Sequence, residues 1–326
     1  MKLIAIEEHF LTNEIRSAWK NSDEKDPTQN LHLGEIENRL DDIGDNRISL
    51  MDESGIDVQV LSLTSPGLHN LGNESIHLAQ QANDLVASII KKRPDRFQGF
   101  ATLPTPAPKE ATKELERSIK TLGLKGAMLC GRTREKNLDH KDFWSLFECA
   151  EALNMPLFIH PQIPQKAIRD IYYSGFEDMT DLAFSTFGLG WHYEAGIQFV
   201  RLVLAKVFDR FPNLQIILGH WGEVILFYTE RLASLNRVTK LNKPFIDYVR
   251  QNLYVTSSGM FSNQYLQRTI EIIGTDRILF SSDYPYQYRP GRDARQFLEH
   301  APLSEDEKEK FGQANWERLT DKIQLS

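Results

Sequence analysis

The segment Lys2-Leu3-Ile4-Ala5-Ile6-Glu7-Glu8-His9 joins an apolar run directly to carboxylate and imidazole side chains, and it is the most informative part of the sequence for the fold. The run is short and continuous, which is typical of a buried strand in a parallel sheet. Acidic residues follow it too soon for a signal peptide. Glu7 and His9 are two positions apart, so on a strand their side chains point to the same face.

Similar apolar runs recur along the chain, and amphipathic segments separate them. The eight expected strands are Lys2–Glu7, Asp57–Leu63, Phe97–Leu103, Leu124–Leu129, Pro156–Ile159, Leu214–Leu218, Leu253–Thr256 and Arg277–Ser281. This alternation indicates an α/β protein whose parallel strands are covered by helices. Eight units favour a closed (β/α)8 TIM barrel. An open doubly wound sheet is the alternative, but no glycine-rich phosphate motif follows the first run.

Two connections are longer than a simple crossover requires. The first runs from Phe10 to about Arg47 and is polar and acidic, and the second runs from Pro161 to about Glu194. The second is rich in aromatic side chains: Tyr172, Tyr173, Phe176, Phe184, Phe187, Trp191 and Tyr193. Long loops inside a compact domain usually form lids, pocket walls or contact surfaces. We therefore expect residues 1–326 to form one barrel domain with insertions after its first and fifth strands.

Composition excludes several classes of protein. Apolar residues make up 41% of the 326 residues and charged residues 25%, which is ordinary for a globular chain. The formal net charge is -7 and no basic stripe is present, so nucleic acid is not an expected partner. No apolar run is long enough to span a membrane. The two cysteines, Cys130 and Cys149, are expected to be free thiols in a reducing compartment, most simply the cytoplasm.

Polar side chains follow four of the expected strands, at the point where each strand ends. Glu7 and His9 end the first strand, His160 the fifth and Asp283 the eighth, and His220 follows the sixth. The carboxyl ends of barrel strands meet at one mouth, where barrel active sites lie. Glu7, His9, His160 and Asp283 would supply two nitrogen and two oxygen donors, which suits a single divalent ion.

The ligand set bears on the metal and on the number of ions. Two carboxylates favour Mn²⁺, although Zn²⁺ also binds such ligands tightly. A bridging side chain for a second ion is not expected, because the lysine of the fourth strand, Lys125, lies near the start of that strand. We therefore expect one ion, Mn²⁺ or Zn²⁺.

His220 is followed three residues later by Glu223, and we interpret the two as an acid–base pair beside the metal. A carboxylate at that spacing can hydrogen-bond the imidazole and fix its tautomer. The remaining histidines lack a strand-end position and are assigned structural roles: His32, His69, His77, His140, His192 and His300.

Taken together, these motifs resemble those of a known enzyme family. They are Glu7-Glu8-His9, His160-Pro161, Gly219-His220-Trp221-Gly222-Glu223 and Ser281-Ser282-Asp283-Tyr284-Pro285, with supporting segments at 47–52, 208–212 and 315–319. The chain resembles the metal-dependent aromatic acid decarboxylases of the amidohydrolase superfamily. That branch includes the γ-resorcylate, 2,3-dihydroxybenzoate and 5-carboxyvanillate decarboxylases and is related to aminocarboxymuconate semialdehyde decarboxylase. Superfamily hydrolases typically carry His-x-His at the first motif, whereas this chain has Glu-x-His.

The resemblance implies an amidohydrolase-type barrel and a role for each motif residue. It implies that Glu7, His9, His160 and Asp283 bind the metal, and that Asp283 is also the acid that protonates the ring carbon. His220 and Glu223 complete the implied catalytic set. The residues implied to contact substrate are Arg47, Arg231 and Tyr286.

The expected activity is the non-oxidative decarboxylation of an ortho-hydroxybenzoate, which makes the chain a carbon–carbon lyase acting on a small aromatic carboxylic acid. One alternative is hydrolysis of a lactone or amide by a metal-bound hydroxide, since the same ligands can support it. Another is a non-catalytic metal-binding assembly protein. We also expect a homodimer or homotetramer, because the insertion at 161–194 exposes many aromatic side chains and the resembling family is oligomeric.

Overall fold

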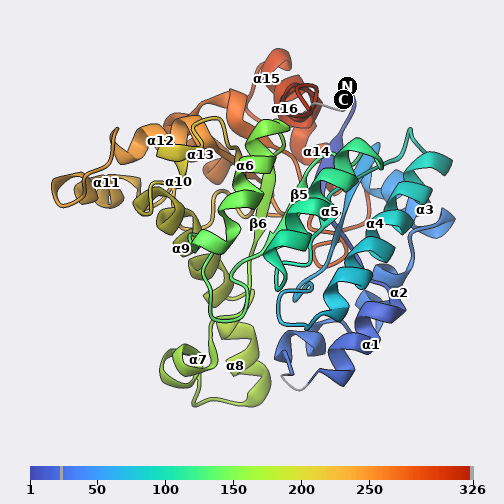
Figure 1. Cartoon of the computed structure of the whole chain (residues 1–326). Helices are drawn as coiled ribbons and strands as arrows, with labels where there is room; N and C mark the ends of the chain where they lie inside the picture. The colour runs from blue at the N-terminus through green and yellow to red at the C-terminus, as the bar shows by residue number, and fades with distance from the viewer. Residues whose placement is uncertain (23–24, 324–326) are drawn as a thin grey trace.

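The computed structural model describes residues 1–22 and 25–323, and strands alternate with helices along the chain (Figure 1). The strands are β1 (Ile4–Phe10), β2 (Val58–Leu63), β3 (Phe97–Gly99), β4 (Ala101–Thr102), β5 (Ala127–Cys130), β6 (Leu157–His160), β7 (Ile216–Leu218), β8 (Leu253–Thr256) and β9 (Ile278–Leu279). The first eight helices are α1 (Asn13–Asn21), α2 (Glu35–Asp41), α3 (Asp45–Ser54), α4 (Glu74–Lys92), α5 (Pro108–Lys120), α6 (Trp144–Ala152), α7 (Lys166–Tyr172) and α8 (Asp178–Ser185). They are followed by α9 (Gly190–Leu204), α10 (Val207–Arg210), α11 (Thr229–Leu232), α12 (Phe245–Asn252), α13 (Asn263–Ile273), α14 (Asp293–Glu299), α15 (Glu305–Glu309) and α16 (Asn315–Thr320).

All strand pairs are parallel, in the order β1-β2-β3 and β4-β5-β6-β7-β8-β9. β3 and β4 are two halves of one expected strand, divided at Phe100, whose amide N–H donates to the Leu61 carbonyl at 2.8 Å. The two ends of the series meet where the Ile6 amide donates to the Phe280 carbonyl at 3.0 Å. The (β/α)8 barrel expected from the sequence is therefore confirmed, with all eight strands in their expected order.

One cluster of buried side chains fills the barrel, and a larger one lies between the strands and the surrounding helices. The inner cluster takes side chains from around the barrel and is completed by α16: Ile4, Ile6, Val58, Val60, Phe100, Met128, Phe158, Ile217, Tyr254, Leu279, Trp316 and Leu319. A barrel of this size is packed solid rather than hollow. Polar side chains can therefore meet only at its open mouth.

β1 carries an irregularity that determines which side chains reach that mouth. Ala5 pairs with Gln59, but the next pairing joins Glu8 to Leu61, so β1 contains one extra residue. Such a β-bulge changes the face to which the following side chains point. Ile4 and Ile6 belong to the inner cluster, and past the bulge Glu7 and His9 also face inward, whereas Glu8 faces outward.

Both insertions lie at the same end of the barrel. In Figure 1, α1 and α2 of the first insertion and α7 and α8 of the second occupy the lower end, while the N-terminus, α15 and α16 lie at the upper end. β1 leads from the N-terminus toward the insertions, so the insertions surround the carboxyl ends of the strands.

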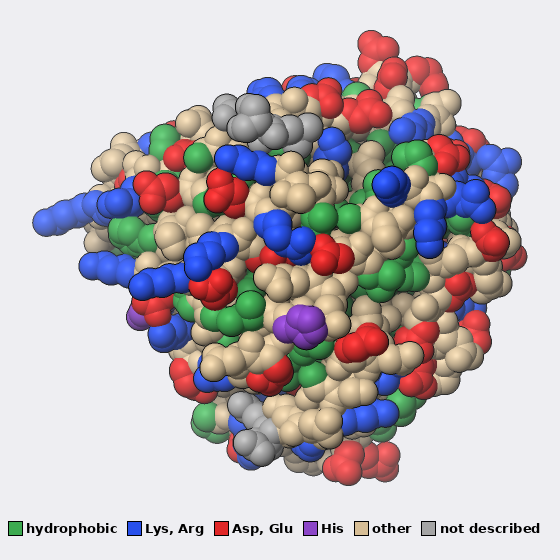
Figure 2. Space-filling view, turned by 45° about the vertical axis from the view of Figure 1, so that its right-hand side comes forward, with side chains coloured by type: hydrophobic (Ala, Val, Ile, Leu, Met, Phe, Trp, Pro, Cys, Tyr) green, Lys and Arg blue, Asp and Glu red, His purple; other side chains and the backbone are tan. Residues whose placement is uncertain are grey.

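The outer surface over the helices carries mixed charge. Figure 2 shows lysine, arginine, aspartate and glutamate side chains interspersed across one face. Surface ion pairs such as Arg117–Asp84, at 2.7 Å, link oppositely charged side chains. This face offers no band of a single charge sign. In the described ranges 1–22 and 25–323, no helix has both the length and the apolar content needed to cross a bilayer.

Arg47 of α3 holds the end of β1 from outside the barrel. Its Nη1 donates to the His9 carbonyl at 2.7 Å, and its Nε donates to Gln59 Oε1 at 2.6 Å. Gln59 in turn donates to Glu8, whose carboxylate also accepts from the amide and hydroxyl of Ser282. We expected Arg47 to bind anionic groups of the substrate, but its side chain is fully buried in this network. In this structure its hydrogen bonds join β1 to β2, and we propose that this is its role.

Replacing Arg47 by methionine is therefore expected to lower stability rather than to change substrate affinity selectively. The change leaves Glu8 buried without its cationic neighbour and removes a bond to the β1 backbone. Breaking a buried charge network by removing one partner costs about 3 kcal/mol or more. The free energy of unfolding, measured by urea denaturation, reports the loss.

Arg93→Met is the matched control, because Arg93 pairs with Asp45 on the surface. An exposed pair of this kind contributes at most about 1 kcal/mol. Equal stability losses in the two variants would contradict the structural role assigned to Arg47.

Candidate functional site

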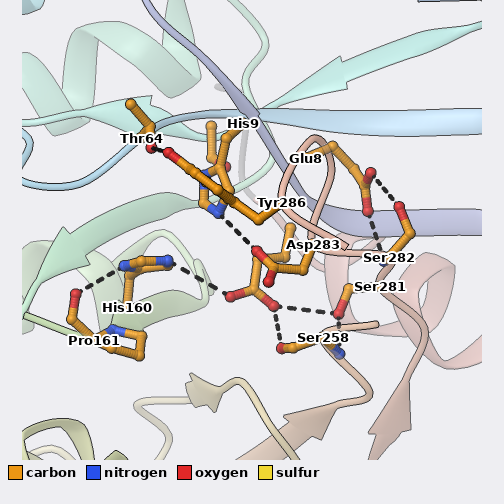
Figure 3. Close-up of polar contacts among 12 residues, drawn as sticks. Glu8, His9, Thr64, His160, Pro161, Ser258, Ser281, Ser282, Asp283 and Tyr286 are labelled. Carbon is orange, nitrogen blue, oxygen red and sulfur yellow. Dashed lines mark hydrogen bonds and ion pairs between the residues drawn. The ribbon is translucent and has the colours of Figure 1, made fainter. Parts of the chain in front are cut away.

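Three donor side chains meet at the mouth of the barrel, two from β1 and one from β6, which are far apart in the sequence. One donor atom each from Glu7, His9 and His160 lies within 4.8 Å of the other two. The His160 Nε2 atom is 3.8 Å from Glu7 Oε1. Figure 3 shows His9 and His160 pointing toward the same point from β1 and β6.

A ring of hydrogen bonds holds each donor in place. Glu7 Oε2 accepts from the hydroxyl of Ser258 and, at 3.3 Å each, from those of Thr256 and Ser281. The ring nitrogen His9 Nδ1 lies 3.1 Å from the Ser62 hydroxyl. Supports of this kind orient metal ligands and tune them.

His160 has a tautomer that suits a metal ligand. Its Nδ1 lies 2.8 Å from the Pro161 carbonyl, which can only accept a hydrogen bond, so Nδ1 carries the proton. In the neutral ring the other nitrogen, Nε2, then presents a lone pair toward Glu7.

The inward-facing atoms of this cluster fit a divalent cation. Glu7 Oε1 and His9 Nε2 are buried and have no hydrogen-bond partner among the described residues. Burial raises the pKa of Glu7 to about 8 and lowers that of His9 to about 3. Burial thus makes the carboxylate charge costly and keeps the imidazole neutral, and a cation between them would stabilise both forms. Mixed oxygen and imidazole donors suit manganese or zinc.

Asp283 lies beside this cluster, on the loop that follows β9. Its Oδ1 is 3.5 Å from His9 Nε2 (Figure 3), but it is not part of the compact three-donor group. Its backbone adopts φ +56°, a left-handed conformation that aspartate tolerates better than most residues. Burial raises the pKa of this carboxyl group to about 7.

His220 and Glu223 occupy an unusual backbone turn after β7. The four residues 220–223 all have positive φ values, of 48°, 57°, 84° and 50°. Left-handed residues normally occur singly, and each non-glycine residue here costs roughly 1–2 kcal/mol. The turn brings His220 Nδ1 to 2.8 Å from Glu223 Oε1, as expected from their spacing. Backbone strain of this kind clusters at functional sites.

The structure adds a third member to this pair that the sequence interpretation missed. His192, in the first turn of α9, places its Nδ1 2.7 Å from the other carboxylate oxygen of Glu223. Its ring centroid is 4.7 Å from that of His220. We assigned His192 a structural role because it follows no strand. The available signal was its position at the end of the aromatic insertion, next to Trp191.

A cavity of about 600 Å³ lies above the donors, between the two insertions. Its lining residues are Leu31, Ile36, Ser65, His160, Phe187, Gly188, Trp191, His192, His220, Ser258, Gly259, Met260, Asp283, Tyr286, Gln287 and Arg289. Among the described residues, Asp283 is the only carboxyl group in this lining and Arg289 its only arginine or lysine side chain. The volume is within the usual range for a small-molecule site. His192 and His220 also line a second cavity, of about 270 Å³, whose lining includes Glu223 as well.

The three residues expected to contact substrate have different positions. Tyr286 lines the cavity, and its hydroxyl is 2.6 Å from that of Thr64. Arg231, on α11, is exposed and does not line the cavity, so a single chain does not bring it to this site. Arg47 is buried outside this cavity. The cationic side chain that does line the cavity is Arg289, which the sequence interpretation missed.

Comparison with known proteins gives consistent matches. A family described as amidohydrolase matches residues 37–319. A γ-resorcylate decarboxylase of Polaromonas sp. is 35% identical, with 97% of each chain covered. A solved dihydroxybenzoic acid decarboxylase from Polaromonas sp. JS666, with bound manganese and the inhibitor 2-nitroresorcinol, has a TM-score of 0.86 and 33% identity, covering 98% of this chain and 97% of that one. A 5-carboxyvanillate decarboxylase from Novosphingobium aromaticivorans, complexed with manganese, has a TM-score of 0.89 and 30% identity, covering 98% and 96%.

The donor geometry predicts one high-affinity metal site per chain. After removal of metal by a chelator, titration calorimetry with MnCl2 is expected to give a stoichiometry of about one. His160→Asn should abolish detectable binding, because it removes a nitrogen that faces Glu7. Ser62→Ala should weaken binding by about tenfold, since it removes only the support of His9.

His140→Asn serves as the control, because that side chain is exposed and lies outside the cluster. Wild-type affinity in the His160→Asn variant would rule out this cluster as the metal site.

Proposed function

The chain belongs to the amidohydrolase family, and we propose that it decarboxylates an ortho-hydroxybenzoate in the cavity above Glu7, His9 and His160. It is a metal-dependent enzyme that releases CO2 from an aromatic carboxylic acid, and manganese is its supported metal, with zinc as an option. The proposal that the substrate is an ortho-hydroxybenzoate rests mainly on Asp283. Among the described residues it is the single carboxyl group of the cavity lining, and it lies 3.5 Å from His9.

We assign the metal to Glu7, His9, His160 and Asp283. The buried and unpartnered atoms Glu7 Oε1 and His9 Nε2 support that assignment, with His160 Nε2 3.8 Å from Glu7 Oε1 and Asp283 Oδ1 3.5 Å from His9 Nε2. When bound, the ion supplies a Lewis acid and a template for the adjacent phenolic and carboxylate oxygens of the substrate. Phe187 and Trp191 from one insertion and Leu31 from the other line the cavity and exclude water from it.

Asp283 is the proposed acid of the reaction. Cleaving the bond between ring and carboxylate directly would leave an aryl carbanion, which is too unstable to form readily. Transfer of a proton from Asp283 to that ring carbon avoids the carbanion. The carbon–carbon bond then breaks, its electron pair restores the aromatic ring, and CO2 leaves. Solvent returns the proton to Asp283.

His220 and Glu223 are proposed to control the phenolic oxygen. The carboxylate accepts from Nδ1, so the other ring nitrogen, Nε2, is the one available to the substrate. Burial would lower the pKa of His220, but the charge of Glu223 and its hydrogen bond raise it to about 10, with smaller contributions from Glu7 and Asp283. The ring is thus held as a hydrogen-bond donor.

Arg289, Tyr286 and Trp191 are proposed to select the remaining substituents of the ring. Arg289 is half-exposed at the cavity rim and pairs with Asp293 at 3.1 Å, so part of its guanidinium remains available to a substrate anion. The buried indole N–H of Trp191 has no acceptor among the described residues. A planar guanidinium suits a carboxylate.

We also propose that the chain assembles as a homodimer or homotetramer. Exposed apolar side chains gather on α9 and beside α11: Leu189, Tyr193, Ile197, Leu204, Phe227 and Tyr228. The Tyr228 side chain is close enough to Tyr193 to raise the pKa of that phenol, so these two segments are neighbours on one surface. Exposed apolar patches of this kind mark contact sites. We further propose that residues 1–326 act as one domain, and that the cytoplasm is its compartment because both cysteines are free thiols.

The proposed reaction predicts a specific product. In D2O, manganese-loaded enzyme is expected to release CO2 from one or more members of a panel of ortho-hydroxybenzoates. The product should carry one deuterium at the carbon that lost the carboxylate. The 2-methoxy analogues should be inert. Asp283→Asn should reduce both CO2 release and deuterium incorporation by at least about 100-fold. Gas analysis and proton NMR measure the two quantities.

Asp276→Asn is the control, since Asp276 pairs with Lys310 on the surface and is absent from the cavity lining. The manganese content of the Asp283→Asn variant is measured alongside, so that loss of metal is distinguished from loss of the acid. Near wild-type turnover in a metal-loaded Asp283→Asn variant would remove Asp283 as the acid. Hydrolysis of a lactone or amide without CO2 release would favour the hydrolase alternative.

The proposed assembly predicts a native mass of at least twice the chain mass in sedimentation velocity. Phe227→Glu is expected to shift the enzyme to a smaller species, because Phe227 is 77% exposed in the single chain. Leu85→Glu on α4, away from this surface, should leave the mass unchanged. A monomeric wild-type protein would refute the proposal.

A further inference from the structure

His192 has hydrogen-bond acceptors at both of its ring nitrogens. Its Nδ1 lies 2.7 Å from Glu223 Oε2, and its Nε2 lies 3.1 Å from the Phe187 carbonyl. An ionised carboxylate and a backbone carbonyl can only accept hydrogen bonds. Both contacts are therefore satisfied only when both nitrogens carry a proton, which is the imidazolium form.

Glu223 is consequently shared between two histidines. Its Oε1 faces His220 Nδ1 and its Oε2 faces His192 Nδ1, and its side chain is fully buried between them. Burial alone would raise the pKa of Glu223, but the charge of His220 and the hydrogen bonds from both rings lower it to about 2. The carboxylate therefore stays ionised and has one fixed orientation.

His192 also connects this group to the cavity wall. The carbonyl that accepts from Nε2 belongs to Phe187, which lines the cavity at the end of the second insertion. His192 itself is the third residue of α9, so its position is fixed by that helix. One side chain thus links the insertion, α9 and the acid–base pair.

We propose that His192 is a positioning residue, an imidazolium that fixes the Glu223 carboxylate and so sets the orientation of the His220 ring for the decarboxylation. The inference rests on the proposed function of His220. With one carboxylate oxygen bound by His192, only the other is available to His220, and its Nε2 is directed to the substrate. Removing His192 frees Glu223 to rotate and leaves the ring of His220 without a fixed orientation.

The same three side chains have a competing interpretation. One atom each from His192, His220 and Glu223 lies within 4.8 Å of the others, a spacing that also permits a second metal ion. The acceptor at His192 Nε2 and the separations of 2.7 Å and 2.8 Å to Glu223 favour hydrogen bonds instead. A metal ligand would require a deprotonated nitrogen.

The protonation of His192 is tested directly by nitrogen NMR on enzyme labelled at its histidine rings, at neutral pH and without substrate. His192→Phe identifies the resonances, and His77→Asn on the exposed face of α4 is the control. Both nitrogens of His192 are expected to carry protons. A chemical shift typical of an unprotonated ring nitrogen at either position of His192 would overturn the proposal. Binding of a second equivalent of manganese that is lost in His192→Phe would also overturn it.

The positioning role is tested by kinetics with the substrate identified from the panel. His192→Phe is expected to lower kcat by about tenfold or more, the effect typical of a supporting residue, with KM little changed. His192→Asn retains one donor toward Glu223 and should recover part of the loss. Unchanged kcat in both variants would refute the role. Equal losses of kcat in the two variants, with the nitrogen NMR signals of His220 unchanged from wild type, would also refute it. The NMR result stands even if no panel acid is turned over, so failure of the proposed function is separately recognised.

Discussion

The carboxylate of Glu7 is the constraint around which the mouth of the barrel is organised. It is fully buried, and an isolated buried carboxylate is very unfavourable unless charge and hydrogen bonds compensate it. Three hydroxyl groups bind one of its oxygens, while the other faces His160 without a partner. A divalent ion held there with His9 would supply the missing charge. The proposed metal site and the proposed position of the substrate both depend on this one group.

The fold places that group through features that are individually costly. The bulge in β1 turns Glu7 and His9 inward directly after Ile6, so the packed interior passes into the polar site within one residue. Arg47 secures the bulged strand from outside. The left-handed residues His220 to Glu223 bring the proposed acid–base pair beside the proposed metal site, at a cost in backbone strain that the surrounding barrel offsets. The insertions then cover the mouth.

The sequence was sufficient for the parts of the structure that depend on periodicity. Buried parallel strands are continuous apolar runs, so all eight were recognisable, and the residues at their ends converge by topology alone. It was not sufficient where a single side chain depends on three-dimensional packing. His192 lies on a helix after an insertion, and nothing local indicates that this helix crosses behind Glu223. The guanidinium of Arg47 suggests an anion-binding residue when only the sequence is known. Its burial depends on how α3 packs against β2. The bulge in β1 could not be recognised from the sequence, because residues on both faces of that strand are apolar up to Ile6.

The most direct test of this account titrates Mn²⁺ into metal-free enzyme and follows CO2 release from an ortho-hydroxybenzoate. The account predicts no turnover without metal and a rate that rises linearly and saturates at about one ion per chain, because a single buried donor cluster of Glu7, His9 and His160 serves the reaction. A rate unaffected by metal removal would contradict it. Saturation at two ions would contradict it equally. The second group of donors, His192, His220 and Glu223, would then bind a metal ion instead of forming hydrogen bonds with one another.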